Sequence, residues 1–410
     1  MQYGLLGRHL SHSYSPQIHK CLGSWPYGLF EKEPDEVKDF LKTSGVVGLN
    51  VTIPYKKAVI PYCDELTTKA KQLGAVNTIV RQQDGRLIGH NTDYFGFLQM
   101  VNRSGLNVSG KKVLVLGSGG ASMTAVAVLK ELNAHVIVIS RSGDNNYNNL
   151  RNHYDASVIV NATPVGMYPD VNAAPLDIAP FNQLEGVLDL IYNPARTMLL
   201  RTAEEKGLVA QNGLWMLVAQ AKESAEWFLG KKISDQAIGQ IHSLLRFQME
   251  NIILIGMPGC GKSTIGMFLA NTLGKEFIDA DQEIQRISGK QIPEIFAASG
   301  ESAFREIETA VLRDLGKRSG LVIATGGGCV TRSENYAHLH KNGTIVWLQR
   351  DINMLPTDGR PLSKAGKLMD MYEKRRPLYQ RFSDMTIAND GTVEATVKSI
   401  ISALKKENET

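Results

Sequence analysis

The sequence predicts an α/β protein made of several domains. Short apolar runs at residues 113–116 and 252–255 have the length and composition of buried strands, and each leads into a helical pattern. A glycine-rich turn joins strand to helix in both places, at residues 117–121 and 256–263. The chain has 410 residues, which is enough for two or three domains. We expect parallel sheets, because strands that alternate with helices pair in parallel.

Composition and charge indicate an ordinary globular protein. Hydrophobic residues make up 43% and charged residues 21% of the chain. The net charge is +4, and the basic residues occur as scattered pairs such as Lys111-Lys112 rather than as a stripe that would bind nucleic acid. The longest uncharged run, 113–129, is too short to cross a bilayer, and the N-terminus lacks the apolar segment of a signal peptide. We therefore expect no nucleic-acid or membrane partner.

The four cysteines favour a reducing compartment. Cys21, Cys63, Cys260 and Cys329 lie far apart, and no C-x-x-C motif is present. This spacing predicts neither a zinc site nor a disulfide framework. We expect a cytoplasmic protein.

Residues 1–100 place polar side chains where strands end. Strands are expected at 3–7 and, as the second strand, at 46–53, and Pro16 is suited to the first turn of a helix. In open α/β sheets, ligands bind at the carboxyl ends of the strands. The polar residues found there are Ser13, Ser15, Asn50, Thr52, Lys56, Asn77 and Asp93.

Residues 111–141 form a βαβ unit of the Rossmann type. The turn at 117–121 follows a strand, a helix comes after it, and a second strand at 136–139 completes the unit. The match to G-x-G-x-x-G is imperfect, because Ser122 occupies the sixth position. The second strand ends in Ser140-Arg141-Ser142, where an NAD site would carry an acidic residue. An arginine there accommodates a 2′-phosphate, so the sequence favours NADP over NAD.

The remaining patterns complete the expected domains. Strands are expected at 157–161 and 186–190, and a helical segment runs from 213 to about 248. We expect a substrate domain at 1–100 completed by helices at about 215–248, a Rossmann domain at 101–214, and a third domain at 249–410.

The stretch from Gly256 to Ser263 matches the P-loop spacing G-x-x-x-x-G-K-[ST]. Its glycines let backbone N–H groups converge on phosphate oxygens at a helix N-terminus. Lys262 would reach the terminal phosphates and Ser263 a Mg²⁺ ion. No apolar strand ends in the aspartate of a motor-type ATPase, which favours a small-molecule kinase.

Lys56 and Asp93 are candidates for acid–base chemistry. Reduction of a ketone by NADPH requires a proton for the oxygen, which a partly buried lysine beside a carboxylate can supply. Periodicity alone leaves the alternative open that Lys56 is one of many surface lysines and Asp93 a turn residue.

A series of ordered motifs in residues 1 to about 245 resembles shikimate dehydrogenases. The motifs are Ser13-x-Ser15, Asn50-Val-Thr52-x-Pro-Tyr-Lys56, Gly74-Ala-Val-Asn77-Thr, Asn91-Thr-Asp93, Gly117-x-Gly-Gly-Ala121, Asn161-Ala-Thr-x-x-Gly-Met167, Asp189-x-x-Tyr192 and Gly213-x-x-Met-Leu-Val-x-Gln220. The resemblance implies that Lys56 and Asp93 are the catalytic pair. It implies substrate contacts at Ser13, Ser15, Thr52, Asn77, Tyr192 and Gln220. It implies NADP contacts at Gly117, Ser118, Gly119, Gly120, Ala121, Leu190 and Gly213, joined by Ser140, Arg141 and Ser142. Where this chain has Ser140-Arg141-Ser142, the family usually has Asn-Arg-Thr followed by a further Arg. This chain has a single Arg there.

Residues 249–410 resemble shikimate kinases. The motifs are the P-loop, Asp279-x-Asp281, Phe304-Arg305-x-x-Glu308, Gly326-Gly-Gly328, Arg360-Pro-Leu and Arg375-x-Pro-Leu-Tyr379. The resemblance implies that Asp279 and Ser263 hold Mg²⁺ and that Asp281 accepts the proton of the attacking hydroxyl. It implies that Arg305, Arg375 and Gly327 bind substrate, that Lys262 is catalytic, and that Arg360 closes on the phosphates as a lid. ATP contacts are implied at Gly259, Cys260, Gly261, Lys262, Ser263 and Thr264. The lid segment is shorter than is usual and lacks a second arginine before Arg360.

The two resemblances together imply a bifunctional enzyme of aromatic amino-acid biosynthesis. The first half would reduce 3-dehydroshikimate to shikimate with NADPH, and the second would phosphorylate shikimate with ATP and Mg²⁺. One alternative is a regulator that binds shikimate or quinate and has lost catalysis, although Lys56, Asp93, Lys262, Asp281 and Arg360 are all retained. Another is a first half that prefers quinate or NAD. The sequence leaves the oligomeric state open.

Overall fold

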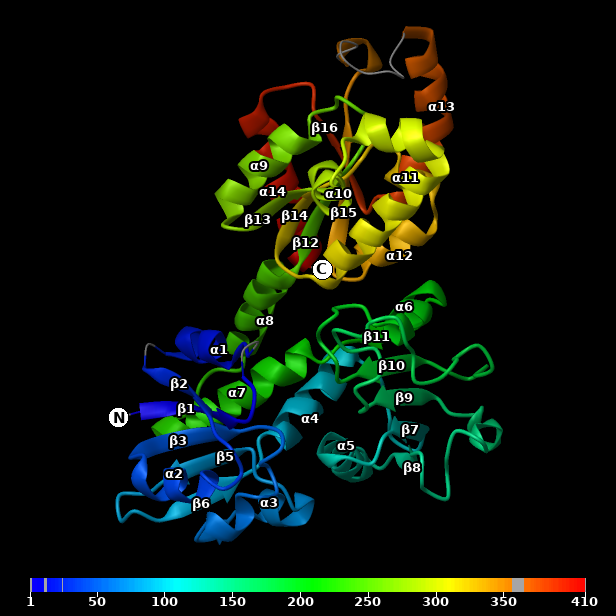
Figure 1. Ribbon diagram of the computed structural model, residues 1–410. Helices are drawn as coiled ribbons and strands as arrows, with labels where there is room; N and C mark the ends of the chain where they lie inside the picture. The colour runs from blue at the N-terminus through cyan, green and yellow to red at the C-terminus, as the bar shows by residue number, and fades with distance from the viewer. Residues whose placement is uncertain (1, 11–12, 24, 356–364, 410) are drawn as a thin grey trace. The chain divides into compact units, whose positions relative to one another are not determined.

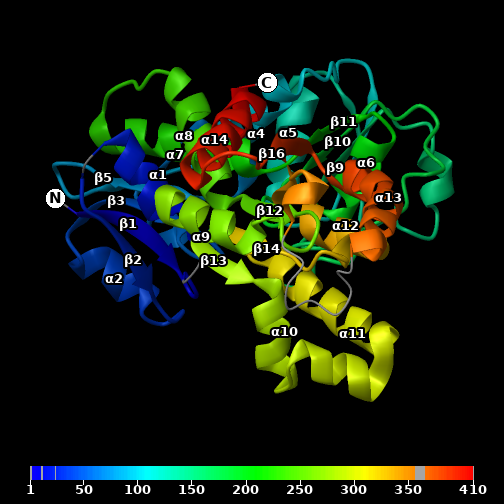
Figure 2. The same cartoon turned by 90° about the horizontal axis from the view of Figure 1, so that it is seen from above.

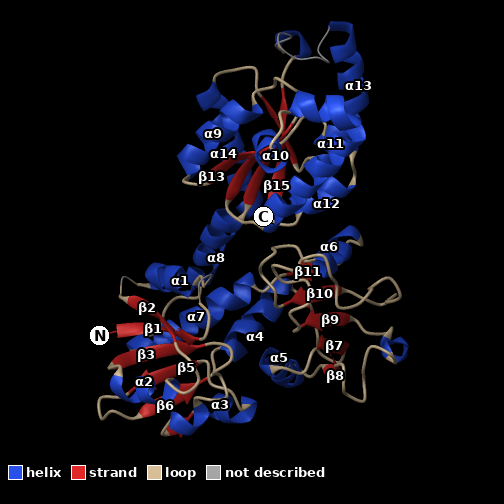
Figure 3. Ribbon diagram, viewed as in Figure 1, coloured by secondary structure: helices blue, strands red, loops and turns tan. Residues whose placement is uncertain are grey.

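The structure is a computed structural model that describes residues 2–10, 13–23, 25–355 and 365–409. Within these residues it confirms the predicted α/β class, with three sheets of six, five and five strands surrounded by helices (Figures 1 and 3). The chain divides into two compact units, Met1–Tyr192 with Thr197–Ser243, and Asn193–Arg196 with Leu244–Thr410. The main division falls inside helix α8 (Gln236–Met249).

The first sheet of the first unit is mixed, with strand order β2-β1-β3-β5-β6-β4. Strand β1 pairs in parallel with β2 and β3, whereas β5 runs antiparallel to β3 and β6. The strands are β1 (Gln2–Gly7), β2 (Tyr27–Glu31), β3 (Val46–Val51), β4 (Glu65–Leu66), β5 (Thr78–Arg81) and β6 (Leu87–His90). The helices here are α1 (Ser15–Leu22), α2 (Val37–Thr43), the 3-10 turn η1 (Ile60–Tyr62), α3 (Thr68–Leu73) and α4 (Asp93–Ser104).

Strand β2 is absent from the sequence-based expectation. It lies at the edge of the sheet and none of its residues is fully buried, so it lacks the continuous apolar run that marks a central strand. The strand expected at 46–53 is confirmed over Val46–Val51, but its rank in the chain and its end were predicted wrongly. It is the third strand, β3, and it stops at Val51 shortly before Pro54, which has no N–H to donate to a ladder.

The second sheet of the first unit is parallel throughout, with order β11-β10-β9-β7-β8. Its strands are β7 (Lys112–Leu116), β8 (His135–Ile139), β9 (Val158–Asn161), β10 (Gly186–Asp189) and β11 (Val209–Gln211). Helix α5 (Gly120–Glu131), the turn η2 (Leu150–His153) and helix α6 (Met198–Glu205) belong to it. The strand order reverses between β7 and β9, and such a switch point is where open α/β sheets bind ligands.

Helices α4 and α7 (Leu214–Leu229) run side by side between the two sheets of this unit (Figure 3). They approach closely because Gly96 has no side chain, since a Cβ there would lie 2.7 Å from the backbone oxygen of Met216. The helical segment expected from 213 to about 248 consists of two helices, with a break that was not predicted. Gly230 ends α7 in the left-handed conformation, and α8 starts only at Gln236.

The second unit has one parallel sheet, with order β13-β14-β12-β15-β16. Its strands are β12 (Asn251–Ile255), β13 (Glu276–Asp279), β14 (Leu321–Ala324), β15 (Gly343–Gln349) and β16 (Met385–Ala388). Its helices are α9 (Lys262–Leu273), α10 (Ala280–Ser288), α11 (Ile292–Lys317), α12 (Glu334–His340), α13 (Ala365–Phe382) and α14 (Val393–Glu409), with turns η3 (Cys329–Thr331) and η4 (Ile352–Met354). Helix α11 kinks at Gly300 and packs along α10 (Figure 2).

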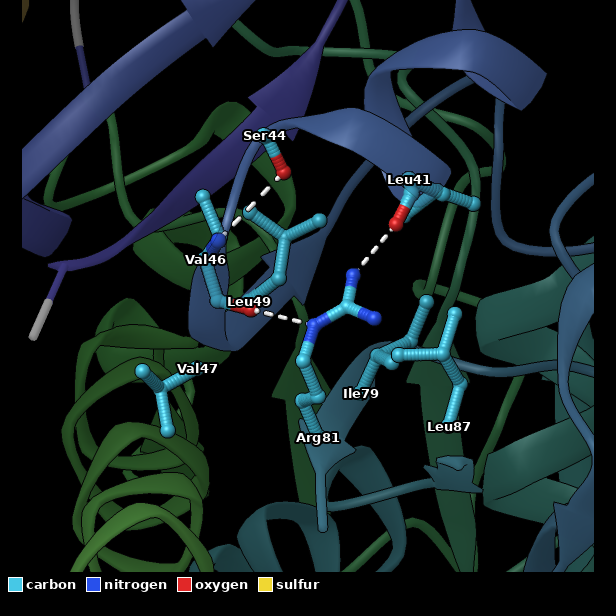
Figure 4. Close-up of a pocket in the computed structure, with 8 residues that line it drawn as sticks. All are labelled: Leu41, Ser44, Val46, Val47, Leu49, Ile79, Arg81 and Leu87. Carbon is cyan, nitrogen blue, oxygen red and sulfur yellow. Dashed lines mark hydrogen bonds between the residues drawn. The ribbon is translucent and has the colours of Figure 1, made fainter. Parts of the chain in front are cut away.

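A small pocket in the first sheet has a structural explanation (Figure 4). The Arg81 guanidinium lies across it and donates to the carbonyls of Val46 (3.1 Å) and Leu41. The arginine thereby ties the end of α2 to β3. The cavity measures about 10 Å³, which holds no more than one water molecule. This pocket is too small to be a substrate site.

None of the helices in the described part of the chain is both long and apolar enough to span a bilayer.

Candidate active sites

The first unit brings Lys56 and Asp93 into direct contact. Lys56 lies in the turn after β3, Asp93 is the first residue of α4, and the Lys56 Nζ donates to Asp93 Oδ2 at 2.6 Å. The backbone N–H of Asp93 donates to Asn91 Oδ1 at 3.1 Å, and the helix N-terminus favours the carboxylate. The Lys56 side chain is 31% exposed and that of Asp93 14%. The pair is therefore enclosed on most sides and open to a ligand on one.

A buried polar network joins two of the expected substrate residues. Asn77 Oδ1 accepts from the backbone N–H of Thr92 (2.7 Å), and the Thr92 hydroxyl lies 3.4 Å from Gln220 Oε1. The fully buried Ser224 connects these groups, since its hydroxyl lies 3.1 Å from that of Thr92 and accepts from Asn50 Nδ2 at 2.7 Å. Strand β3, the start of α4 and helix α7 are thus fixed to one another beneath the site. Sequence reasoning missed Ser224 altogether.

His19 extends this network toward the start of α1. Its Nε2 lies 3.1 Å from Asn50 Oδ1, which also accepts from the Tyr27 hydroxyl at 2.8 Å. Because Asn50 Oδ1 can only accept, Nε2 carries the proton. Burial lowers the pKa of His19 to about 3, against the opposing effect of its bond to Asn50. The imidazole therefore stays neutral in the folded protein at neutral pH.

We expect His19 to make the first unit sensitive to acid. In the unfolded chain a histidine takes up a proton below about pH 6.5, whereas folded His19 resists protonation until about pH 3. Stability present above pH 6.5 is therefore lost as the pH falls toward 3, at up to about 1.4 kcal/mol per pH unit. Unfolding is followed by calorimetry between pH 7.5 and 4.5, and the transition of the first unit is the one whose melting temperature rises when NADP⁺ is added. That melting temperature should decrease less with acid in His19→Gln than in wild type.

His9 provides the control for this measurement, because it is exposed. His9→Gln should follow the wild-type curve. Parallel pH curves for wild type and His19→Gln would contradict the assignment.

The other expected substrate residues lie around the carboxyl ends of the first sheet. Ser13 Oγ accepts from the backbone N–H of Ser15 (3.2 Å) at the start of α1, and Thr52 follows β3. Tyr192 lies beyond β10, yet its ring meets that of Tyr14 edge-on at 6.2 Å. The second sheet thereby contributes Tyr192 next to the serine pair.

A cleft of about 570 Å³ opens over the switch point of the second sheet. Its lining residues are Gly117, Ser118, Gly119, Ser140, Arg141, Tyr147, Ala162, Thr163, Pro164, Val165, Ala174 and Pro175. Five of these were expected as cofactor contacts, and the other five expected contacts, Gly120, Ala121, Ser142, Leu190 and Gly213, lie outside the lining. Tyr147 was missed, because no motif marks it.

Two local contacts hold residues that were expected to bind the cofactor. Ser122, which breaks the glycine motif, donates from Oγ to the Gly117 carbonyl at 2.6 Å and is buried, so the serine holds the turn together. Gly117 itself needs its positive φ of 104°. Gly213 lies directly against Leu190, since a Cβ at 213 would meet the Leu190 oxygen at 2.1 Å. Leu190 and Gly213 are thus in direct contact.

Asp189 braces the loop that carries Tyr192. It is buried and accepts hydrogen bonds from Asn161 (3.0 Å), Thr197 (2.7 Å) and the backbone N–H of Ile191 (3.1 Å). Burial raises the pKa of Asp189 to about 6, although these bonds oppose the shift.

The second unit forms a phosphate cradle between β12 and α9. Gly256, Gly259 and Gly261 adopt positive φ angles of 146°, 85° and 97°, which other residues rarely adopt. Lys262 is 8% exposed, and its Nζ donates to the carbonyls of Gly256 (2.9 Å) and Met257 (3.0 Å). The ammonium is therefore held within the loop, beside the place where phosphates would bind.

Ser263 and Asp279 form a pair suited to magnesium. The Ser263 hydroxyl donates to Asp279 Oδ2 at 2.6 Å, and Asp279 Oδ1 accepts from the backbone N–H of Asp281 at 3.0 Å. Among the described residues, no three His, Cys, Asp or Glu side chains gather as metal ligands. One hydroxyl and one carboxylate nevertheless fit Mg²⁺, which takes its other oxygens from water and nucleotide phosphates.

The glycine run at residues 326–328 brings two arginines and two carboxylates together. Arg305 donates to the fully buried Glu308 at 2.7 Å, and Arg375 donates to the Gly327 carbonyl at 3.2 Å. A Cβ on Gly326 would lie 2.6 Å from Glu308 Oε1 and 2.8 Å from Asp281 Oδ1. The three consecutive glycines therefore let these charged groups approach the backbone.

Burial raises the pKa of Glu308, and Arg305 opposes this shift. Burial lowers the pKa of Arg305, but Glu308 and Glu301 outweigh it and raise the pKa overall. The arginine thus stays cationic, as binding of an anionic ligand requires. The expected lid residue, Arg360, lies outside the described residues.

The first unit combines a cleft over the switch point of a parallel sheet with a lysine–carboxylate pair, which fits a nicotinamide-dependent dehydrogenase, and the second unit has a P-loop kinase fold. Family models match the shikimate dehydrogenase substrate-binding domain at residues 5–79 and shikimate kinase at residues 258–405. The chain belongs to the shikimate dehydrogenase family, and a shikimate kinase domain follows the dehydrogenase part of the chain.

Individual relatives agree with this assignment. A shikimate dehydrogenase (NADP⁺) from Clostridium perfringens is 34% identical over 266 residues, which are 60% of this chain and 98% of the relative. Shikimate dehydrogenase 1 from Peptoclostridium difficile is 37% identical with a TM-score of 0.55, covering 60% of this chain and 97% of that one. A chorismate mutase/shikimate 5-dehydrogenase fusion protein from Clostridium acetobutylicum is 36% identical with a TM-score of 0.57, over 60% of this chain and 96% of that one.

Proposed function

We propose that this chain catalyses two successive reactions, NADPH-dependent reduction of 3-dehydroshikimate and ATP-dependent phosphorylation of the resulting shikimate. The observation that carries the proposal is the retention of both catalytic sets. The Lys56–Asp93 contact is 2.6 Å long, and Lys262 occupies an intact P-loop. A regulator without catalytic activity would not need either set, and no observation favours that alternative.

In the first reaction Lys56 supplies a proton. When bound, NADPH would supply the hydride that the carbonyl carbon receives. As the C=O bond becomes C–O, the Lys56 Nζ gives its proton to the oxygen and later regains one from water. Asp93 accepts a hydrogen bond from the Lys56 ammonium and thereby orients it. Ser13, Ser15, Thr52, Asn77, Tyr192 and Gln220 would hold the ring's carboxylate and hydroxyls.

In the second reaction Asp281 accepts the proton of the attacking hydroxyl. A new oxygen–phosphorus bond forms to the γ-phosphate while the bond to the β-phosphate breaks, and ADP leaves. Lys262 and the P-loop N–H groups neutralise the growing charge, and Ser263 with Asp279 would hold Mg²⁺. Arg305 and Arg375 are placed to bind the substrate's carboxylate, for which guanidinium groups are suited. We assign lid closure to Arg360 from its motif.

The proposed domain boundaries correspond to these two reactions. We assign residues 1–100, completed by the helices at about 215–248, to the substrate domain, 101–214 to NADP binding and 249–410 to the kinase. Packing of α7 against β3 and β5 supports the return of the chain to the first sheet. We propose a cytoplasmic location, which the four free cysteines support.

NADP selectivity is assigned to Arg141. It is the one charged side chain among the described residues that line the cofactor cleft. Arg141→Ala should weaken binding of adenosine 2′,5′-bisphosphate roughly 10- to 100-fold, the usual effect of losing a charged hydrogen-bond partner, and leave 5′-AMP binding unchanged. Titration calorimetry measures both. Arg151→Ala, at an exposed position, is the control, and an equal loss for both ligands would contradict the role.

The proposed function is tested by giving the wild-type chain 3-dehydroshikimate, NADPH and ATP·Mg²⁺ together. We expect NADPH oxidation, ADP formation and a phosphorylated product in equal amounts. Omission of ATP should stop the sequence at shikimate. Absence of phosphorylated product would overturn the proposal, and faster turnover with quinate and NAD⁺ would favour that alternative for the first half.

A further inference from the structure

Asn389 makes a contact with the P-loop that no motif marks. It follows β16, is 5% exposed, and its Nδ2 donates to the Cys260 carbonyl at 2.7 Å. Its Oδ1 accepts from the Thr396 hydroxyl at 2.8 Å, and its backbone N–H donates to the Gln349 carbonyl at 2.7 Å. The side chain and the backbone of Asn389 are therefore both anchored, and Asn389 links the loop to β15 and α14.

The chemistry of these partners fixes the orientation of the amide. The Cys260 carbonyl can only accept, so it must face the NH₂ group of Asn389. Oδ1 is then left for Thr396, whose hydroxyl can donate. A rotated amide would place two oxygens 2.7 Å apart at Cys260, which is repulsive. Thr396 therefore helps to present the amide donor to the P-loop.

Anchoring this carbonyl also sets the direction of the next N–H. In a trans peptide unit the C=O and N–H bonds point in opposite directions. Because the Cys260 oxygen points to Asn389 beneath the loop, the N–H of Gly261 points away from it, toward the concave side where phosphate oxygens would bind. The packing is tight, since a Cβ on Gly261 would lie 2.7 Å from Asn389 Nδ2.

We propose that Asn389 is a positioning residue for nucleotide binding, which holds the Cys260–Gly261 peptide so that the Gly261 N–H is aimed at the phosphates of a nucleoside triphosphate. The inference rests on the proposed kinase function and adds the residue that keeps the cradle in its binding geometry. Asn389 touches the loop and not the ligand, so its substitution should affect nucleotide affinity and leave the shikimate site alone.

The test uses the full chain and two variants that keep the shape of the side chains. Asn389→Asp replaces the amide donor by an oxygen, and Thr396→Val removes the hydroxyl, with Thr396→Ser restoring it. In calorimetry we expect the dissociation constants of ADP·Mg²⁺ and ATP·Mg²⁺ to rise roughly tenfold or more in Asn389→Asp. A smaller rise is expected in Thr396→Val and none in Thr396→Ser. The KM for shikimate and the dehydrogenase activity of the same chain should stay at wild-type values.

Asn251→Asp is the matched control for burial of an acid. Asn251 is fully buried in β12 and also donates to a backbone carbonyl, that of Arg318, at 2.7 Å, but it lies at the opposite end of the strand from the P-loop. The Asn251→Asp substitution should lower the melting temperature without changing nucleotide affinity. Wild-type nucleotide affinity in Asn389→Asp, or equal loss for nucleotide and shikimate, would overturn the inference.

If Asn389→Asp does not fold, the test is the nucleotide affinity of Thr396→Val compared with that of Thr396→Ser. Equal nucleotide affinities of these two variants would overturn the inference. Failure of the wild-type chain to bind ATP would instead overturn the proposed kinase function.

Discussion

Replacing Lys262 by alanine is expected to lower kcat/KM for shikimate phosphorylation about 10²- to 10³-fold or more, the effect of removing one preorganised charge-stabilising group. In the structure Lys262 is 8% exposed, and its ammonium donates to two loop carbonyls. A bound triphosphate would offer the same ammonium stronger, charged acceptors. Alanine removes both the charge and the contacts that hold the loop. NADPH-dependent reduction by the first unit should remain at the wild-type rate.

The exposed Lys290 provides a matched control in the same unit, because Lys290→Ala removes one positive charge without touching the P-loop. Steady-state assays of both reactions on each variant check the prediction. Loss of both activities in a folded Lys262→Ala protein would contradict the assignment of two independent sites.

The fold was largely predictable because its central strands are buried on both faces. Strands β7 and β12 read as unbroken apolar runs, and each passes into a glycine turn and a helix. Edge strand β2 and the break at Gly230 escaped prediction for the converse reason. A half-exposed edge strand has no continuous run, and a single glycine in a helical pattern does not by itself define where a helix ends.

The parts of the sites that motifs did not reveal depend on contacts between distant residues. Asn50 and Ser224 meet across 174 positions of the chain, and Cys260 and Asn389 across 129. Asn50 and Cys260 lie in motifs, but Ser224 and Asn389 are ordinary polar residues in their local context, and only the packing of strands and helices brings the partners together. Ser122 shows the opposite case, because an apparent defect in the glycine motif becomes a hydrogen bond to Gly117 once the turn is seen.

Removal of the Lys56 side chain should have the largest effect on the first reaction. We expect Lys56→Ala to lower kcat for NADPH-dependent reduction about 10²- to 10⁴-fold, the usual contribution of a positioned general acid. Phosphorylation of added shikimate should be unchanged. The adjacent Lys57→Ala is the control, because Lys57 is exposed and the substitution removes the same charge one residue away.

The 2.6 Å contact between Lys56 and Asp93 adds a sharper test. If Asp93 acts by orienting the Lys56 ammonium, its own substitution costs activity only while that lysine is present. Asp93→Asn should therefore be harmful in the wild-type background and nearly silent in Lys56→Ala, because groups that act as a unit are not additive. Kinetic constants of the two single variants and the double variant give the coupling. Additive losses would show that the two residues act separately, and Asp93 would then need a role of its own on the substrate.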